Sequence, residues 1–149
     1  MPKRWPWWHV KLRERGYRVT IPRKAIIDFL SRSRKHPTAE NIYLAVHKTY
    51  PAIGLTTVYR TLELLEELGV IRRLDFGDGR NRYDIWGGPR WRSHEHLFCM
   101  KCGRVMDYTD FVTEEDKLLK KIGGILSRKY KFKIKTHQIH FYGVCKKCR

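Results

Sequence analysis

Four cysteines in two CxxC pairs are the residues of this chain whose spacing most clearly predicts chemistry. The pairs are Cys99/Cys102 and Cys145/Cys148, and together they use every cysteine of the 149-residue sequence. Each CxxC turn can supply two thiolates, and a structural zinc ion takes four ligands with Zn–S distances of ~2.3 Å. We therefore expect a closed four-cysteine zinc site, without an open position for Lewis-acid chemistry. A redox pair is the alternative interpretation of a CxxC motif.

A second group of potential metal ligands lies directly upstream of the first CxxC pair. His94 and His96 have the same parity along a strand, so both imidazoles can face one site. Together with Glu95 they also suggest a zinc hydrolase or deaminase. A zinc deaminase, however, carries a proline before its CxxC pair, and neither pair here follows a proline. We expect no enzyme.

The elements that must position these ligands begin with an N-terminal half that has helical patterns. Thr20 with Pro22 predicts one helix start, and Thr38 predicts the next. Thr56 is the expected N-cap of a third helix, and Gly69 is expected just after its end. Two strands joined by a Gly-Asp-Gly turn follow, which predicts a winged helix-turn-helix. A basic helix near residues 5–15 precedes it. The expected phosphate contacts of the wing are Arg72, Arg73, Arg80 and Arg82.

The C-terminal half combines strands with one helix. We expect strands near 96–100 and 104–108, a helix near 113–129, and a strand over 131–143 with a bulge near Thr136. Gly123-Gly124 inside the helix predicts either close packing or a break. Gly87-Gly88-Pro89 predicts a hinge. The expected division is therefore residues 1–86, a hinge over 87–93, and residues 94–149.

Composition predicts the partner. The formal net charge is +17, from 32 Lys and Arg against 15 Asp and Glu, which favours a polyanion such as nucleic acid over a merely soluble basic protein. No apolar run approaches ~18 residues, so no membrane contact is expected. The first residues lack an apolar h-region, so we expect no signal peptide, a cytoplasmic protein and reduced cysteines.

Six segments carry a resemblance to a known family. They occur in the family's order as RVTIPRKAII, HPTAENIY, GLTTVYRTLELL, GDGRNRYD, HEHLFCMKCGRVMDY and HQIHFYGVCKKC. The chain resembles the ferric uptake regulator family of metal-dependent transcriptional repressors. The resemblance implies an α+β protein with an N-terminal winged helix-turn-helix domain and a small α/β dimerisation domain. It also implies a homodimer that binds AT-rich, pseudo-palindromic operators in double-stranded DNA when a regulatory metal is bound, and no small-molecule substrate.

The same resemblance implies where the regulatory metal binds. Its ligands correspond to His36, Asp84, His94, His96 and Asp107. Imidazoles with carboxylates suit Fe²⁺ or Mn²⁺, with Zn²⁺ able to substitute in vitro. A second regulatory site corresponds to Glu95, Glu114 and His137, although Ser93 stands where the family has a further histidine. Since His137 shares the parity of Ile139 and Phe141, a core histidine is the alternative there.

The expected recognition helix runs from Thr56 to Leu68. Tyr59 is expected to contact thymine methyl groups, with a packing role as the alternative, and Arg60 to contact phosphate or a guanine edge. The expected DNA-binding residues are Arg15, Arg18, Thr56, Thr57, Tyr59, Arg60 and Arg80.

Three alternatives to an iron-responsive repressor of metal homeostasis stay open. A peroxide-sensing repressor, which uses Fe²⁺ to oxidise a ligand histidine, is favoured by Asp84 with Asp107, whereas the GLTTVYRTL helix favours iron-uptake control. A zinc-sensing repressor fits the carboxylates less well. A constitutive nucleic-acid-binding module would hold the structural zinc alone, so the number of metals per chain separates it from a sensor.

Overall fold

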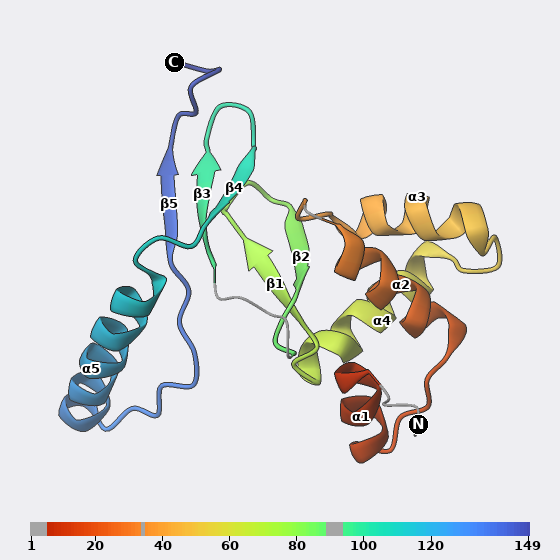
Figure 1. The fold of residues 1–149 in the computed structure, drawn as a ribbon, viewed down its shortest axis with the longest axis horizontal. Coiled ribbons are helices and arrows are strands. Elements are labelled where there is room, and N and C mark those ends of the chain that lie inside the picture. Colours follow the sequence, from red (N-terminus) through yellow and green to blue (C-terminus); the bar gives the residue numbers. More distant parts are fainter. Residues whose placement is uncertain (1–5, 34, 89–93) are drawn as a thin grey trace. The chain divides into compact units, whose positions relative to one another are not determined.

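The computed structural model describes residues 6–33, 35–88 and 94–149, and it divides into two compact units. We call Met1–Arg92 the helical unit and Ser93–Arg149 the sheet unit. Figure 1 shows the helices and strands of each unit. In the described residues, no helix has both the length and the apolar character needed to cross a membrane. Each unit is built from the local signals of its own segment.

The described part of the helical unit contains four helices: α1 (Trp7–Glu14), α2 (Ile21–Arg32), α3 (Ala39–Thr49) and α4 (Leu55–Glu67). Thr20 is the N-cap of α2 and a proline occupies its first turn, as predicted. Thr38 caps α3 through a capping box, in which Thr38 and Asn41 each bond the other's backbone N–H. The predicted cap of α4 was wrong. Its N-cap is Gly54 rather than Thr56, so the helix begins earlier than the hydroxyl pattern indicated.

The wing follows α4 as an antiparallel pair of strands, β1 (Ile71–Asp75) and β2 (Asn81–Ile85). Gly69 has a φ of +65° just after α4, a left-handed conformation that favours glycine. The Gly-Asp-Gly turn between the strands is as predicted. The backbone N–H of Tyr83 donates to the Pro37 carbonyl at 2.9 Å, which fastens the wing to the segment before α3.

One hydrophobic core joins the helices to the wing. Its helical contribution includes Val58, Leu62, Leu65 and Leu68, the stripe expected along α4. The basic helix α1 belongs to this core through Trp8 and Leu12. A Cβ at Gly88 would overlap the indole ring of Trp7, so glycine there permits close contact with α1. Of the predicted hinge over 87–93, residues 89–93 lie outside the described residues.

The sheet unit contains β3 (Glu95–Cys99), β4 (Val105–Tyr108), α5 (Val112–Tyr130) and β5 (His140–Gly143). The strand order is β4-β3-β5, with β3 antiparallel to β4 and parallel to β5. The strand expected over 131–143 was wrong in its extent, because residues 132–139 form no strand and pairing starts only at His140. A mixed polar and apolar run is consistent with a strand, but only a partner strand supplies the hydrogen bonds.

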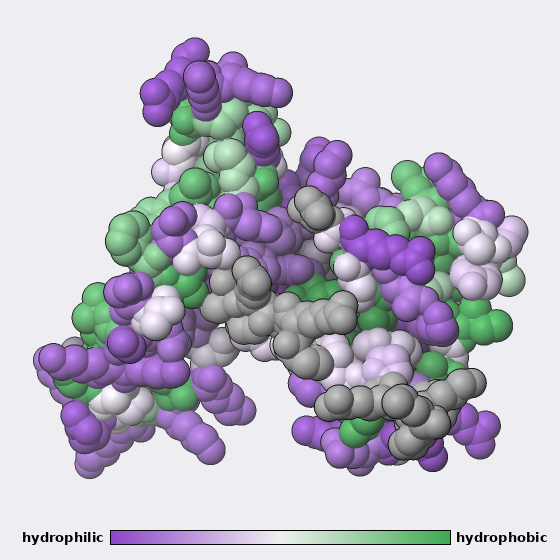
Figure 2. Space-filling model, in the orientation of Figure 1, coloured by the Kyte–Doolittle hydropathy of each residue, from purple (hydrophilic) through white to green (hydrophobic). Residues whose placement is uncertain are grey.

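Helix α5 leaves most of its apolar stripe exposed. Val112 is its only buried residue, while Leu118, Ile122, Ile125 and Leu126 are exposed. Gly123-Gly124 neither breaks the helix nor marks a close contact, since an added Cβ would meet only Ile134 Cδ1, at 3.8 Å from Gly123. Figure 2 shows hydrophobic side chains among the hydrophilic ones on the surface of the sheet unit. Several large apolar side chains along one helix are therefore left in contact with solvent.

Candidate functional site

The four cysteines converge at one end of the sheet unit. Cys99 ends β3, Cys102 lies in the turn before β4, and Cys145 and Cys148 follow β5. Because β3 and β5 run parallel, their carboxyl ends bring the two CxxC turns to the same edge of the sheet. All four sulfur atoms lie within 4.8 Å of one another. Two turns distant in the sequence thus form one cluster.

The geometry of the cluster fits a tetrahedral metal and not a disulfide. Cys102 Sγ and Cys145 Sγ lie 3.8 Å apart, and all four cysteines are free thiols. Four sulfurs at ~2.3 Å around one zinc would be separated by about 3.8 Å, so this spacing matches one edge of the tetrahedron. A disulfide would need about 2.05 Å.

The environment of the sulfurs favours thiolate at Cys99 and the protonated thiol at Cys148. The backbone N–H of Cys145 donates to Cys99 Sγ at 3.3 Å, and with the N–H of Cys102 it lowers the pKa of the Cys99 thiol to about 6. The sulfurs of Cys145 and Cys102 raise the pKa of Cys148 to about 12, because neighbouring thiols hold its proton. A cation would replace these protons, so the residues fit a bound metal.

A histidine and carboxylate group lies beside the sheet's central strand. His94 and His96 have ring centroids 5.2 Å apart, and His96 is fully buried. Asp107 on β4 is the register partner of His96, with Nε2 and Oδ1 separated by 3.7 Å. The ligand atoms of these three residues all lie within 4.8 Å of one another. Imidazole and carboxylate donors in this arrangement suit a divalent transition metal.

His140 lies beside His96, although no motif in the sequence pointed to it. It is the register partner of His96 across the parallel β3/β5 pair, with ring centroids 5.5 Å apart. Its Nε2 lies 3.1 Å from Gln138 Oε1. An amide oxygen only accepts, so His140 Nε2 is the donor in this hydrogen bond. Only the strand register could have found this residue.

In the helical unit, His36 and Asp84 lie next to each other. His36 Nδ1 is 4.0 Å from Asp84 Oδ2, and Asp84 is the last residue but one of β2. The same Asp84 oxygen accepts a hydrogen bond from Arg72 at 3.4 Å. The guanidinium of Arg72 also stacks on Trp86, 4.7 Å from the ring centroid. Arg72 therefore orients the carboxylate and is not the phosphate contact that was expected.

The residues of the second predicted metal site do not gather. Within the part of the chain that the structure describes, Glu95, Glu114 and His137 form no common group of ligand atoms. His137 is exposed, so the alternative of a core histidine is also wrong. Ser93 lies outside the described residues.

The exposed side of α4 carries four of the seven predicted DNA-binding residues. Thr56, Thr57, Tyr59 and Arg60 are exposed on α4, while Val58 and Leu62 face the core. Arg15, Arg18 and Arg80 are exposed as well. Arg82 is not: it is buried, makes two hydrogen bonds to Asp78 at 3.1 and 2.8 Å, and stacks on Phe76. Its expected role as a phosphate contact was wrong, because it holds the wing's turn in shape.

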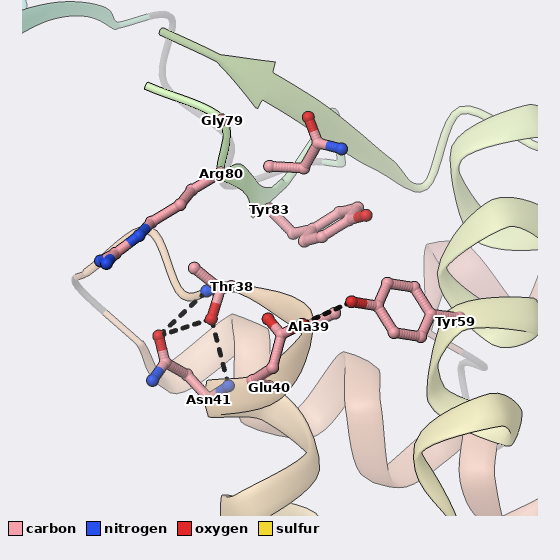
Figure 3. Close-up of a pocket in the computed structure, with 9 residues that line it drawn as sticks. Thr38, Ala39, Glu40, Asn41, Tyr59, Gly79, Arg80 and Tyr83 are labelled. Carbon is pink, nitrogen blue, oxygen red and sulfur yellow. Dashed lines mark hydrogen bonds between the residues drawn. The ribbon is translucent and has the colours of Figure 1, made fainter. Parts of the chain in front are cut away.

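A hollow of about 440 Å³ lies between the start of α3, helix α4 and the wing. Figure 3 shows Glu40, Tyr59, Arg80 and Tyr83 around it, from three different elements. The Tyr59 hydroxyl donates to Glu40 Oε1 at 2.5 Å. This link was not expected from the sequence, because the two residues are 19 positions apart. The predicted contact residue Tyr59 is thus held by an acidic side chain of the neighbouring helix.

Comparisons with known proteins agree with this architecture. The model of the ferric uptake regulator family matches residues 14–142. The ferric uptake regulation protein of Bacillus subtilis (strain 168) is 42% identical over 139 residues, 93% of this chain and 89% of that protein. The peroxide-responsive repressor PerR of Staphylococcus aureus (strain USA300) is 32% identical over 138 residues, 93% of this chain and 86% of the relative. Among solved structures, the Pseudomonas aeruginosa ferric uptake regulator with manganese has a TM-score of 0.73 at 28% identity, over 94% of this chain and 98% of that one.

Proposed function

This chain belongs to the ferric uptake regulator family and is a metal-dependent transcriptional repressor, and we propose how its two units divide that work. The sheet unit holds a structural metal and part of a sensing site. The helical unit holds the other part of that site and binds DNA. The single observation that supports this division is that each unit already pairs a histidine with a carboxylate.

Zinc is the proposed structural metal. Cys99, Cys102, Cys145 and Cys148 hold it, and their 3.8 Å sulfur spacing and backbone N–H donors support a tetrahedral thiolate site. With four protein ligands the ion has no open position, so what it supplies is folding free energy. The two CxxC turns tie the end of β3 to the segment after β5.

The sensing metal, in our proposal Fe²⁺ or Mn²⁺, is shared by two half-sets of ligands. His94, His96 and Asp107 belong to the sheet unit, and their ligand atoms lie within 4.8 Å of one another. His36 and Asp84 belong to the helical unit and lie 4.0 Å apart. A metal that binds only when both half-sets meet stabilises one arrangement of the units over all others. Occupancy is thereby coupled to the placement of the DNA-binding surface.

DNA binding follows from the helical unit. Helix α4 is the proposed recognition helix in the major groove, with Thr56, Thr57, Tyr59 and Arg60 on its exposed side. Arg15, Arg18 and Arg80 supply phosphate or minor-groove contacts. We propose AT-rich, pseudo-palindromic operators, because two identical half-sites match a symmetric dimer.

The proposed dimer uses the apolar surface of the sheet unit. The exposed side chains of α5, among them Leu118 and Ile122, are joined by Phe141 and Tyr142 on the edge strand β5. Exposed apolar side chains on a helix and a free sheet edge are the features that a second copy of the chain would cover.

The test is metal stoichiometry measured together with DNA affinity. Mn²⁺-loaded protein first selects its binding sequence from a random duplex pool, and the affinity for that sequence is then compared with and without chelator. We expect two metals per chain and binding that requires the second one. His94→Ala removes a sensing ligand and should abolish the Mn²⁺ response while the zinc stays bound, whereas His47→Ala, a histidine outside both half-sets, should not. Equal affinity in chelator and in Mn²⁺ would refute the sensor.

A peroxide-responsive repressor is the second candidate. Both carboxylates of the proposed sensing site are aspartates, and the chain is similar to PerR of Staphylococcus aureus. The experiment treats Fe²⁺-loaded and Mn²⁺-loaded protein with peroxide and examines the peptides by mass spectrometry. One added oxygen atom on His36, His94 or His96 with Fe²⁺ alone supports this candidate. Unmodified histidines with both metals support metal sensing.

A further inference from the structure

The short hydrogen bond between Tyr59 and Glu40 ties the recognition helix to the helix before it. Tyr59 lies in the second turn of α4 and Glu40 in the first turn of α3, and the hydroxyl and carboxylate oxygens are 2.5 Å apart. Both side chains are exposed and line the hollow between α3, α4 and the wing (Figure 3). The link thus lies on the surface proposed to face the DNA.

Chemistry dictates the direction of this hydrogen bond. The bond from Tyr59 lowers the pKa of the Glu40 carboxyl, and Arg80 nearby acts in the same direction, so the group is ionised at neutral pH. The same bond raises the pKa of Tyr59, which therefore keeps its proton. An ionised carboxylate only accepts, so the Tyr59 hydroxyl donates. The hydroxyl proton is used in the hydrogen bond to Glu40. Toward any other polar group the hydroxyl can therefore act only as an acceptor.

Because the Tyr59 hydroxyl can only accept a further hydrogen bond, it can bind the hydrogen-bond donors on a DNA surface and not the acceptors. Phosphate oxygens, guanine O6 and N7, adenine N7 and thymine O4 are all acceptors and cannot bond it. The donors in the major groove are the amino groups of adenine N6 and cytosine N4. The negative charge of Glu40 beside the hydroxyl also disfavours a phosphate at this point.

We propose that Glu40 is a specificity-determining residue, which positions Tyr59 to accept a hydrogen bond from a base amino group in the major groove. The inference rests on the proposed function, since it takes α4 as the recognition helix. Adenine N6 is the favoured donor, because the proposed operators are AT-rich. The Tyr59 ring remains able to touch a neighbouring thymine methyl, so ring and hydroxyl read different features of the site. Glu40 acts through Tyr59 and makes no base contact itself.

The test measures base preference in Mn²⁺-loaded protein. The wild type selects its sequence from a random duplex pool, and each position is then scored for wild type, Tyr59→Phe, Glu40→Gln and the double variant. Tyr59→Phe keeps the ring and should lower the preference for adenine at one position of each half-site by about tenfold. Glu40→Gln should lower it at the same position, because a glutamine amide can donate to the hydroxyl and free its proton. The double variant should lose no more than either single one.

A modified base and a charge-matched variant complete the experiment. Purine without the 6-amino group, placed at the selected adenine, should weaken wild-type binding about tenfold and leave Tyr59→Phe unaffected. Glu67→Gln removes one negative charge from the exposed end of α4, and should change the affinity for all sequences alike.

Several results would overturn the inference. One is an unchanged base preference in Tyr59→Phe; another is a Glu40→Gln variant that behaves like Glu67→Gln. Loss of a preference for cytosine at the position, in place of adenine, supports the amino-group mechanism and corrects only the base. A wild-type protein that selects no sequence with Mn²⁺ refutes the proposed function itself, a result that none of the variant comparisons can produce.

Discussion

The helical unit buries a broad apolar core, whereas the described part of the sheet unit buries few side chains, most of them candidate metal ligands. Side chains from all four helices and the wing form the core of the helical unit, among them Leu12, Ile26, Ile42 and Leu65. Among the described residues of the sheet unit, those buried are His96, Phe98, Cys99, Val112 and Cys145. Three of these five carry metal-binding atoms.

The difference teaches what each unit needs in order to be stable. A domain of about 60 residues has a marginal core unless a metal, a disulfide or a partner supplements it. The helical unit meets its need with packed side chains. The sheet unit combines a sulfur cluster at one edge with an exposed apolar helix face, so we expect its stability to depend on the proposed zinc and on the proposed dimer.

The largest effect is expected for Cys99→Ser, which tests whether the sheet unit depends on its proposed metal. One of four sulfurs is lost, and structural zinc contributes on the order of 10–16 kcal/mol to the folding of small zinc domains. We expect the variant to lose its zinc and the amide protection of β3 and β5 in hydrogen exchange, while α2–α4 stay protected. Met100→Ser, an exposed change within the same turn, is the matched control. Protected β3 amides in zinc-free Cys99→Ser would contradict the prediction.

The converse change targets the core of the helical unit. Leu65 is fully buried in α4, so Leu65→Ala should lower the free energy of unfolding of that unit by about 2–5 kcal/mol. Urea unfolding followed by hydrogen exchange measures it, and the zinc content should stay the same. The exposed Leu44 on α3 provides the comparison, since Leu44→Ala should change the value by no more than about 0.5 kcal/mol. A similar loss of unfolding free energy in Leu65→Ala and in Leu44→Ala would contradict the prediction that α4 forms part of the stabilising core.

A charge on the exposed face of α5 tests the proposed dimer interface of the sheet unit. Ile122→Lys places an ammonium group in the proposed dimer interface, where it loses water without gaining a partner. We expect the dimer dissociation constant to rise about tenfold or more, which is about 1.4 kcal/mol or more. Sedimentation of Ile122→Lys beside Thr113→Lys, which adds the same charge at an exposed polar position of α5, measures it. The same constant for both would place the interface elsewhere.

The smallest expected effect is a pH dependence within the sheet unit. Burial, together with a hydrogen bond to Glu115 at 3.1 Å, raises the pKa of Tyr108 to about 12. The folded state therefore holds this proton more tightly than the unfolded state, whose tyrosines titrate near about 10. The contribution is complete below about pH 10 and is lost as the pH rises to about 12.

Tyr108→Phe removes this titration. In unfolding measurements from about pH 9 to about pH 12, the stability difference between wild type and variant should shrink as the pH rises. Parallel curves for the two proteins would show that the Tyr108 hydroxyl has no proton-linked role.

Much of the fold was predictable, because the signals that determine it are local. Thr38 starts α3, Gly69 follows α4, and the apolar spacing from Val58 to Leu68 fits a helix with one buried face. Each of these depends on residues within a turn or two of one another. Two of the errors occurred where a long-range partner decides the outcome. Residues 132–139 form no strand because they lack a partner strand, and Arg82 is buried because Asp78 and Phe76 enclose it.

The sequence by itself determined which side chains form the four-sulfur cluster of this protein. Each CxxC turn supplies two sulfur ligands through its local spacing alone. The four cysteines therefore predicted a closed tetrahedral site without any knowledge of the strands. Only the tertiary structure decided which distant side chains meet. The parallel register of β3 and β5 sets His140 beside His96, and the packing of α3 against α4 sets Glu40 against Tyr59. The physical reason is that spacing along the chain specifies a turn of backbone, whereas register and helix packing depend on the whole folded unit.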